Sequence, residues 1–317
     1  MKKNPYSPSK RRLVKIKRRI SGILSGRKKS LRMNLYLGDL FNTFEGQPTL
    51  SQYYIVARII EADLVRREIY DKSYGEFIAR AARGMENSKE KTIHTMKMYR
   101  GFLEHLDEVG FNPDLGCLSV ASSADGIFAD DGTHRLGWLY WAGIKYVSVS
   151  LDDRAPKYPL KGREELKKGG IDETVLSELD RAFEEIRKGL HGELLVILRD
   201  SVAGEIPALL SGKGQLEKIT LSNSSVNEKV RENEIPEEIW RLYYDYKDCP
   251  CHIYTLKLPE NRLWLRDGKL HSVAVEEITK EIDRLTGTKS WGYIANSVTE
   301  SLGLRECLSR LEHDYWE

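Results

Sequence analysis

The stretch from residue 127 to 149, Ile-Phe-Ala-Asp-Asp-Gly-Thr-His-Arg-Leu-Gly-Trp-Leu-Tyr-Trp-Ala-Gly-Ile-Lys-Tyr-Val-Ser-Val, predicts a strand, a tight turn, a helix and a second strand. Its apolar start leads into Asp130-Asp131-Gly132, where the glycine lets the backbone bend sharply and lets a ligand approach closely. Thr133 is expected to cap the helix, which then stops at Gly143. Alternating apolar residues over 146–151 indicate the second strand.

The start of this helix has the features of a phosphate site. The first turn of a helix carries amide N–H groups without intrahelical partners, and the helix dipole is positive there. Gly132 and Thr133 supply backbone amides, while His134 and Arg135 add an imidazole and a guanidinium that can bind phosphate bidentately. Cations at this end are unfavourable unless an anion offsets them, which favours a phosphate site. The alternative, a capped helix with no ligand, stays open.

Two carboxylates precede the turn. Asp130 and Asp131 could hold Mg²⁺ through their oxygens, orient a neighbouring cation, or accept a proton from a hydroxyl group. We therefore expect Asp131, His134 and Arg135 to be the catalytic residues, and Asp130 and Asp131 to bind the metal.

Outward from this stretch, helical periodicity and turn residues divide the chain. Upstream they predict helices at 49–70, with Thr49 or Ser51 as its cap, at 76–83 and at 92–109, and a hairpin over 117–129. Downstream they predict a linker with Pro156 and Pro159, helices at 172–189 and from Pro236, strands at 193–198 and 253–258, a strand–turn–strand around 266–268, a loop at 222–234 and two C-terminal helices. We expect a basic arm over 1–32, a domain over 33–155 that holds the phosphate site, and an α+β region of unrecognised fold over 156–317.

Length and composition indicate a globular protein. The chain has 317 residues, of which 40% are apolar and 31% charged, and this suffices for one large core or two smaller ones. No stretch approaches 18 uninterrupted apolar residues, and the first residues lack the apolar segment of a signal peptide. Four cysteines in a chain of this length do not form a disulfide scaffold. We expect a cytoplasmic protein that could associate with the inner face of a membrane.

The charge is distributed unevenly. Residues 1–32 carry thirteen Lys and Arg and no Asp or Glu, which leaves 37 Lys and Arg against 48 Asp and Glu, a balance of −11, in the remainder. Such a body repels polyanions, so contact with nucleic acid or an anionic membrane is expected through the arm or through a local patch. Within the arm, Leu13, Ile16, Ile20 and either Ile23 or Leu24 predict a narrow apolar stripe among cations, typical of a helix on an anionic membrane. A basic tail, or a helix packed on the acidic body, is the alternative; DNA is the less favoured partner.

Other motifs are interpreted as structural. Cys249-Pro-Cys251-His252 lacks a second ligand pair at the spacing that structural zinc sites use. Ser211-Gly-Lys-Gly214 lacks the spacing of a phosphate loop and reads as a turn. Trp138, Tyr140 and Trp141 are expected to pack mainly in the core, although one of them could stack on a base.

The pattern Asp-Gly-Thr-His-Arg at 131–135, with its following helix and strand, resembles the nucleotide-binding signature of the ParB/sulfiredoxin superfamily. The preceding helix that ends in Glu108-Val-Gly110 and the hairpin after it share this resemblance, which covers about residues 97–151. Upstream, Ser51-Gln52-Tyr53 with Val56-Ala-Arg58 is similar to a helix of uncharacterised ParB-like proteins from cell-surface glycan clusters. The resemblance implies that Gln52 and Arg58 also contact the nucleotide.

The superfamily includes several activities, and the sequence separates some of them. Sulfiredoxins need a cysteine in the loop, where this chain has Thr133, so thiol chemistry is not expected. Partition proteins add helix-turn-helix DNA readers, and residues 152–317 show no clear motif of that kind. Members that phosphorylate free serine share the Asp-Gly-x-x-Arg loop and use ATP or ADP with Mg²⁺.

The expectation is therefore an α+β protein with a ParB/sulfiredoxin-like domain that is preceded by helices. The expected activity is Mg²⁺-dependent phosphate transfer from ATP or ADP, with CTP as a further candidate, to a small hydroxylated acceptor, in envelope glycan metabolism for example; nucleotide hydrolysis is included. The alternative is a protein that binds nucleotide without turnover and engages DNA or a membrane through its arm.

Overall fold

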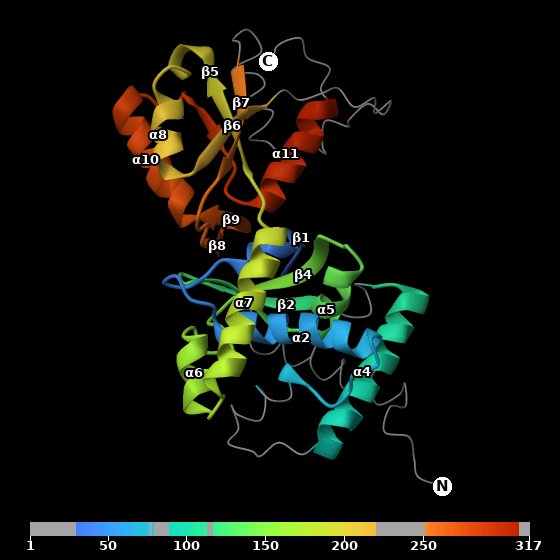
Figure 1. Cartoon of the computed structure of the whole chain (residues 1–317). Helices are drawn as coiled ribbons and strands as arrows, with labels where there is room; N and C mark the ends of the chain where they lie inside the picture. The colour runs from blue at the N-terminus through green and yellow to red at the C-terminus, as the bar shows by residue number, and fades with distance from the viewer. Residues whose placement is uncertain (1–29, 76–77, 79–88, 113–116, 220–250, 311–317) are drawn as a thin grey trace, which may run out of the picture.

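The computed structural model describes residues 30–75, 78, 89–112, 117–219 and 251–310. These residues form a mixed α+β protein, as expected, with two lobes stacked one above the other (Figure 1). We call residues 31–190 the first lobe and residues 194–310 the second lobe. The predicted helix at 76–83, apart from Ile78, the loop at 222–234 and the helix from Pro236 lie outside the described residues. None of the described helices is both long and apolar enough to cross a membrane.

The first lobe is built on a four-stranded sheet. Its strands are β1 (Leu31–Tyr36), β4 (Tyr146–Asp153), β2 (Leu118–Ser123) and β3 (Gly126–Asp131), in that spatial order. The β2–β3 hairpin and the strand from Tyr146 confirm the sequence prediction. β2 and β4 run parallel, because α5 carries the chain across the sheet between β3 and β4, while the other neighbours are antiparallel.

Helices cover one face of this sheet. They are α2 (Leu50–Arg66), α4 (Lys89–Val109), α5 (Thr133–Trp141), α6 (Gly162–Lys168) and α7 (Glu173–Gly189), with a 3-10 turn η1 (Leu37–Phe41) after β1. Helix α2 is central, since 12 of its 17 residues are buried. Thr49 caps it in a reciprocal pair with Gln52, in which each side chain accepts a hydrogen bond from the other residue's backbone.

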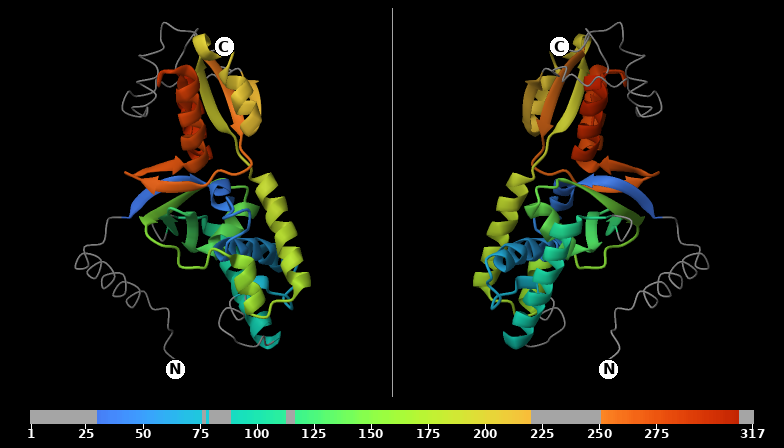
Figure 2. Two further views of the ribbon diagram at one scale, coloured as in Figure 1. Left: turned by 90° about the vertical axis from the view of Figure 1, so that its left-hand side faces the viewer. Right: turned by 90° about the vertical axis from the view of Figure 1, so that its right-hand side faces the viewer.

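The second lobe contains a smaller antiparallel sheet. Its strands are β10 (Gly292–Ile294), β5 (Leu194–Arg199), β7 (Cys251–Lys257) and β6 (Gln215–Ile219), in that order. Around it lie η3 (Asp200–Val202), α8 (Ile206–Lys213), α10 (Val273–Thr286) and α11 (Val298–Arg310). The hairpin of β8 (Leu263–Arg266) and β9 (Lys269–Ser272) lies between the lobes, alongside the first sheet (Figure 2).

The two hydrophobic cores divide later in the chain than the expected boundary at 155–156. The first core extends through α6 and α7 to Leu190, because apolar residues of these helices such as Phe183 pack with those of α2. The second core consists of residues from Leu194 onward together with Tyr36 of β1, while Leu263 and Leu270 of the β8–β9 hairpin pack in the first core. The linker region therefore belongs to the first lobe.

The basic arm ends before residue 32. Leu31 pairs with Leu151 and Arg32 with Ser150 in the β1–β4 ladder, so both residues belong to the first sheet. These residues form a strand because apolar side chains alternate at Leu31, Met33 and Leu35, which share the face toward the core. Residues 1–29 lie outside the described part of the chain.

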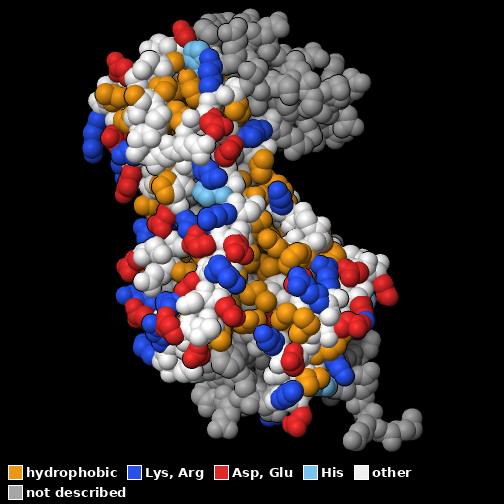
Figure 3. Space-filling model, viewed as in Figure 1, with side chains coloured by type: hydrophobic (Ala, Val, Ile, Leu, Met, Phe, Trp, Pro, Cys, Tyr) orange, Lys and Arg blue, Asp and Glu red, His pale blue; other side chains and the backbone are white. Residues whose placement is uncertain are grey.

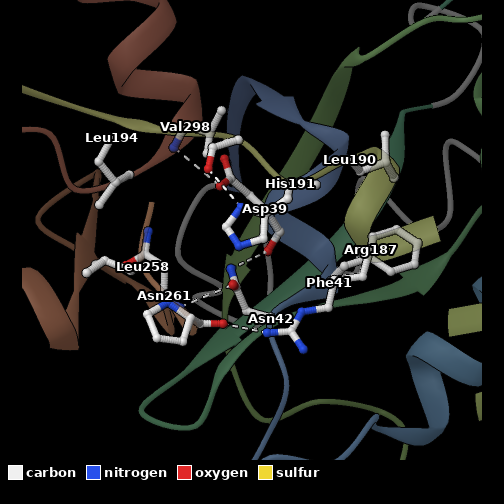
Figure 4. A pocket seen from close by; sticks show the side chains of 13 residues that line it. Asp39, Phe41, Asn42, Arg187, Leu190, His191, Leu194, Leu258, Asn261 and Val298 are labelled. Carbon is white, nitrogen blue, oxygen red and sulfur yellow. Dashed lines mark hydrogen bonds between the residues drawn. The ribbon is translucent and has the colours of Figure 1, made fainter. Parts of the chain in front are cut away.

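A buried carboxylate joins the two lobes. Asp39 of η1 is 2% exposed and accepts hydrogen bonds from the amides of Val298 and Thr299 (3.4 and 3.2 Å) and from the Thr299 hydroxyl (2.7 Å). These amides form the first turn of α11, where the helix dipole favours an anion. A cavity of about 40 Å³, lined also by His191 and Asn261, lies beside it (Figure 4).

We expect Asp39→Asn to become progressively more stable relative to wild type as the pH rises. Burial raises the pKa of Asp39 to about 6, although the Thr299 and Val298 hydrogen bonds oppose this rise. The folded protein thus holds a proton that the unfolded chain releases near pH 4, so the Asp39 contribution to stability falls between pH 4 and pH 6. Urea unfolding should show the variant's relative free energy rising by about 3 kcal/mol from pH 4 to pH 7. Asp172→Asn is the control: its free energy of unfolding relative to wild type should fall as the pH rises, because hydrogen bonds from Thr174 lower the pKa of that exposed helix cap. A constant difference at Asp39 would contradict the prediction.

Candidate functional site

The turn before α5 is formed by a glycine in the left-handed region. Gly132 has φ 88° and occupies the N-cap position, and Thr133 is the first helical residue. The expected cap at Thr133 is therefore wrong, since no side chain caps this helix and the backbone of Gly132 makes the turn. The Gly132 amide donates to Oδ1 of Asp131 at 2.7 Å, which fixes the turn locally.

The first turn of α5 leaves backbone donors available. The amides of Arg135 and Leu136 both donate to the carbonyl of Gly132, at 2.9 and 3.2 Å. The amides of Thr133 and His134 have no acceptor among the residues that the structure describes. Two donors without acceptors at the positive end of a helix can bind an anion.

Arg135 reaches back toward the start of its own helix. A Cβ atom on Gly132 would lie 3.1 Å from Nη2 of Arg135 and would overlap the side chain of Leu118. The guanidinium carbon of Arg135 also lies 6.0 Å from the ring centre of Phe111. Only glycine allows this arrangement, which places a planar cation beside the two available amides.

His134 faces the interior between helices, and it is uncharged. Its ring meets the ring of Tyr99 edge to face at 5.1 Å, and its carbonyl accepts from the Tyr99 hydroxyl at 2.9 Å. Burial, together with the positive charges of Arg58 and Arg135, lowers the pKa of His134 to about 3. The expected second cation of the phosphate site is therefore a neutral imidazole.

The two carboxylates before the turn do not share a site. Asp130 is buried, forms an ion pair with Arg154 and accepts from the backbone amide of Lys157 at 3.0 Å. Asp131 is exposed, and among the described residues the Gly132 amide is the sole hydrogen-bond donor to its carboxylate. Successive residues of a strand point to opposite faces, which separates the two carboxylates. Asp130 therefore anchors the loop after β4, contrary to the expected metal pair.

Arg58 is locked in a buried network. Its guanidinium, in a residue that is 7% exposed, forms an ion pair with the fully buried Glu61. Glu61 also accepts hydrogen bonds from the Ser73 hydroxyl and from the Gly75 amide, the latter at 2.8 Å. A Cβ on Gly75 would overlap the guanidinium, so the backbone lies directly on it. Arg58 Nε is buried without a hydrogen-bond partner among the described residues.

Gln52 has a structural role. Its side-chain oxygen accepts from the Thr49 amide at 2.8 Å, and its side-chain nitrogen donates to the carbonyls of Leu40 (3.0 Å) and Asn42 (2.6 Å). Both donor hydrogens are thus in use, and the residue is 1% exposed. The nucleotide contact that the resemblance implied for Gln52 does not fit this arrangement.

The aromatic residues after the loop were expected to pack mainly in the core, and the structure confirms this in part. Trp138 is buried, with its indole N–H on Asp107 at 2.7 Å. Tyr140 is half-buried, and Trp141 is 44% exposed, with its N–H on the Ile59 carbonyl at 2.8 Å. These hydrogen bonds hold both indoles in place, the first buried and the second exposed.

The structure describes the other two motifs in part. Cys251 is buried in β7 while the neighbouring His252 bonds Asp200 at 2.7 Å, and Cys249 lies outside the described residues. Across the described part of the chain, no three His, Cys, Asp or Glu side chains converge as a metal site would require. Residues 211–213 are the last residues of helix α8, so they do not form the separate turn that was expected.

The sequence reasoning missed Glu61, Ser73 and Tyr99. Glu61 lies three residues after Arg58, a spacing that pairs charges on a helix, so a signal for this contact was present. Ser73 and Tyr99 join the network only through tertiary packing, so no local sequence pattern predicts their contacts.

Charge is mixed over the visible surface. On the face shown in Figure 3, Lys and Arg are interspersed with Asp and Glu over both lobes. A surface of this kind does not favour a nucleic acid on that face, since duplex binding needs a continuous cationic patch. A groove of about 1140 Å³ also lies on the described part of the chain, and its lining includes the carboxylate of Asp152 and the guanidinium groups of Arg154 and Arg266.

No family model, curated protein or solved structure matches the chain.

Proposed function

We propose that the chain binds ATP, ADP or CTP at the start of α5 and either transfers a phosphate to a small hydroxylated acceptor or hydrolyses the nucleotide. One observation carries this proposal: the amides of Thr133 and His134 have no acceptor within the described chain, and the Arg135 guanidinium lies beside the same turn. Phosphoryl transfer depends mainly on positioning the phosphates and stabilising their charge. Oriented amides and a planar guanidinium supply both functions.

The exposed carboxylate at the turn suits the chemical step. In the proposed transfer, the acceptor oxygen attacks the terminal phosphorus, the bond to the leaving nucleotide oxygen breaks, and the acceptor proton passes to Asp131. Asp131 lies immediately before Gly132, and its exposure leaves it accessible to an acceptor. Hydrolysis follows the same scheme with water as the acceptor.

Magnesium fits this site through one protein ligand. Mg²⁺ in such sites is commonly held by one or two carboxylates together with the substrate phosphates. Asp131 could serve as that carboxylate as an alternative to accepting the proton, whereas the ion pair with Arg154 makes Asp130 unsuitable. When bound, the ion would neutralise charge on the phosphates.

The resemblance of residues 97–151 to the ParB/sulfiredoxin superfamily supports the same proposal, because the members that phosphorylate free serine share the Asp-Gly-x-x-Arg loop. A glycan precursor as the acceptor rests on the resemblance alone. The alternative, a nucleotide-binding protein without turnover that engages DNA or an anionic membrane through residues 1–32, is separated from an enzyme by turnover measurements.

We expect Arg135→Ala to weaken ADP and ATP binding about 10- to 150-fold. This range corresponds to about 1.5–3 kcal/mol, as is usual for hydrogen bonds to charged groups. Titration calorimetry measures it directly. Arg181→Ala is the matched control, because Arg181 is an exposed α7 residue with only a long ion pair of 4.0 Å to Glu185. Equal affinity of wild type and Arg135→Ala would remove the phosphate site from the start of α5.

A further inference from the structure

The groove of about 1140 Å³ lies at the end of the first sheet that is remote from the start of α5. Its walls are the turn between β2 and β3, the end of β4 and the tip of the β8–β9 hairpin. Strand β3 runs from that turn to Asp131, so the length of a whole strand separates the groove from the turn at Gly132. The occupant of the groove can therefore be inferred independently of the proposed function.

The lining of the groove combines apolar surface with carboxylates. Its half-buried apolar side chains include Leu31, Trp264 and Leu265. Its carboxylates are those of Asp152, Asp153 and Asp267. Two guanidiniums also line it, but that of Arg154 is already paired with Asp130, a buried residue outside the lining. Counting Asp130, four carboxylates thus meet two guanidiniums, and the groove suits a segment that has both apolar and cationic side chains.

The basic arm leads directly to this groove. Residues 1–29 precede Leu31, which lines the groove and pairs with Leu151 at the outer end of the β1–β4 ladder. β4 extends two residues past this pair, so continuing the same antiparallel register would place Lys29 opposite Asp153. Opposite charges that face each other across neighbouring strands stabilise the pairing. The register of the first sheet therefore directs the cationic end of the arm toward the carboxylates of the groove.

We propose that the groove is the docking surface of the chain's own basic arm: the cations of residues 27–29 meet the carboxylates of Asp153 and Asp267, and Ile23 or Leu24 packs against Trp264. The arm is tethered at the edge of the groove, so docking is intramolecular, and a short tether gives an effective concentration on the order of millimolar. In the docked arm these cations are neutralised by the protein's own carboxylates, so an anionic membrane or nucleic acid has to displace them.

The first test is limited trypsin digestion of the full chain at low salt, with the products identified by mass spectrometry. Docking shields the cleavage sites in residues 27–29, so Asp153→Asn/Asp267→Asn should be cut there about three- to thirtyfold faster than wild type, the range for losing two exposed ion pairs. Both positions are exposed, and asparagine tolerates the positive φ of Asp267, so the fold is retained. The control Glu108→Gln/Glu277→Gln removes two exposed carboxylates elsewhere and should be cut like wild type.

Salt provides a second comparison. At 0.5 M NaCl the difference between wild type and the groove variant should largely disappear, because exposed ion pairs are screened. Equal cleavage rates of wild type and the groove variant at low salt overturn the proposal. So does a control variant that is cut as fast as the groove variant, because the effect would then follow from net charge alone.

The second test locates the contact by zero-length carbodiimide cross-linking, which joins an amine and a carboxylate that touch. We expect links from Lys28 or Lys29 to Asp153 or Asp267 within a single chain, and their loss in 0.5 M NaCl. Links from these lysines only to carboxylates outside the groove would overturn the proposal. Groove links found only in a cross-linked dimer would assign the groove to the arm of a second copy and would likewise overturn intramolecular docking.

Discussion

Glu61→Ala is expected to lower the free energy of unfolding by about 3–5 kcal/mol, the usual cost of removing one partner of a buried ion pair. The substitution leaves the Arg58 guanidinium charged and buried, and it deprives the Ser73 hydroxyl and the Gly75 amide of their acceptor. Two groups therefore lose hydrogen bonds, and a third loses its counterion, around a carboxylate that has no solvent exposure. Urea unfolding followed by circular dichroism measures the effect.

Two comparisons identify the buried charge as the cause. Glu104→Ala removes the partner of Arg100 on the exposed side of α4 and should cost well under 1 kcal/mol. The double variant Arg58→Met/Glu61→Met should recover most of the stability that Glu61→Ala loses, since no uncompensated charge remains. If Glu61→Ala cost no more than Glu104→Ala, the network would not be the rigid support that its contacts indicate.

Local patterns predicted most of the elements of this fold. The hairpin of β2 and β3, the helix α5 and the strand β4 follow from turn residues and periodicity inside one stretch of sequence. Short elements were missed, namely α6, α8, β6 and β10, because three to eight residues carry too little periodicity. β1 was also missed, although Leu31, Met33 and Leu35 alternate clearly, because the cations before it suggested a basic arm that continued through residue 32.

The candidate site was predictable where it is local and not where it depends on packing. Gly132 and Arg135 lie within four residues of one another, and the ability of a helix start to bind an anion can be predicted from sequence. The charge of His134 is not, because it depends first on burial and then on Arg58 of another helix. Thr49 and Gln52 carried a capping-box spacing that explains Gln52 without a ligand. The link between Asp39 and Thr299 joins residues 260 apart, beyond any local pattern.

Asp131→Asn is expected to reduce phosphate transfer or nucleotide hydrolysis at least 10²-fold while it preserves nucleotide binding. Asparagine keeps the shape of the side chain and its ability to accept from the Gly132 amide at 2.7 Å, but it cannot take a proton from the acceptor. The loss is on the scale of a positioned proton-transfer group. Metal-free nucleotide should bind as well as to wild type or tighter, because a carboxylate beside the phosphates is removed.

The measurement is paired: nucleotide affinity by calorimetry and turnover by phosphate release, on the same preparation of Asp131→Asn. Asp125→Asn is a matched control, since Asp125 lies in the turn at the far end of the same hairpin. If Asp131 only braces the turn, asparagine should lower the melting temperature, the affinity and any turnover together. That parallel loss would leave Asp131 with a structural role, whereas loss of turnover alone, with binding and melting unchanged, separates the chemical step from the phosphate grip of Arg135 and the α5 amides.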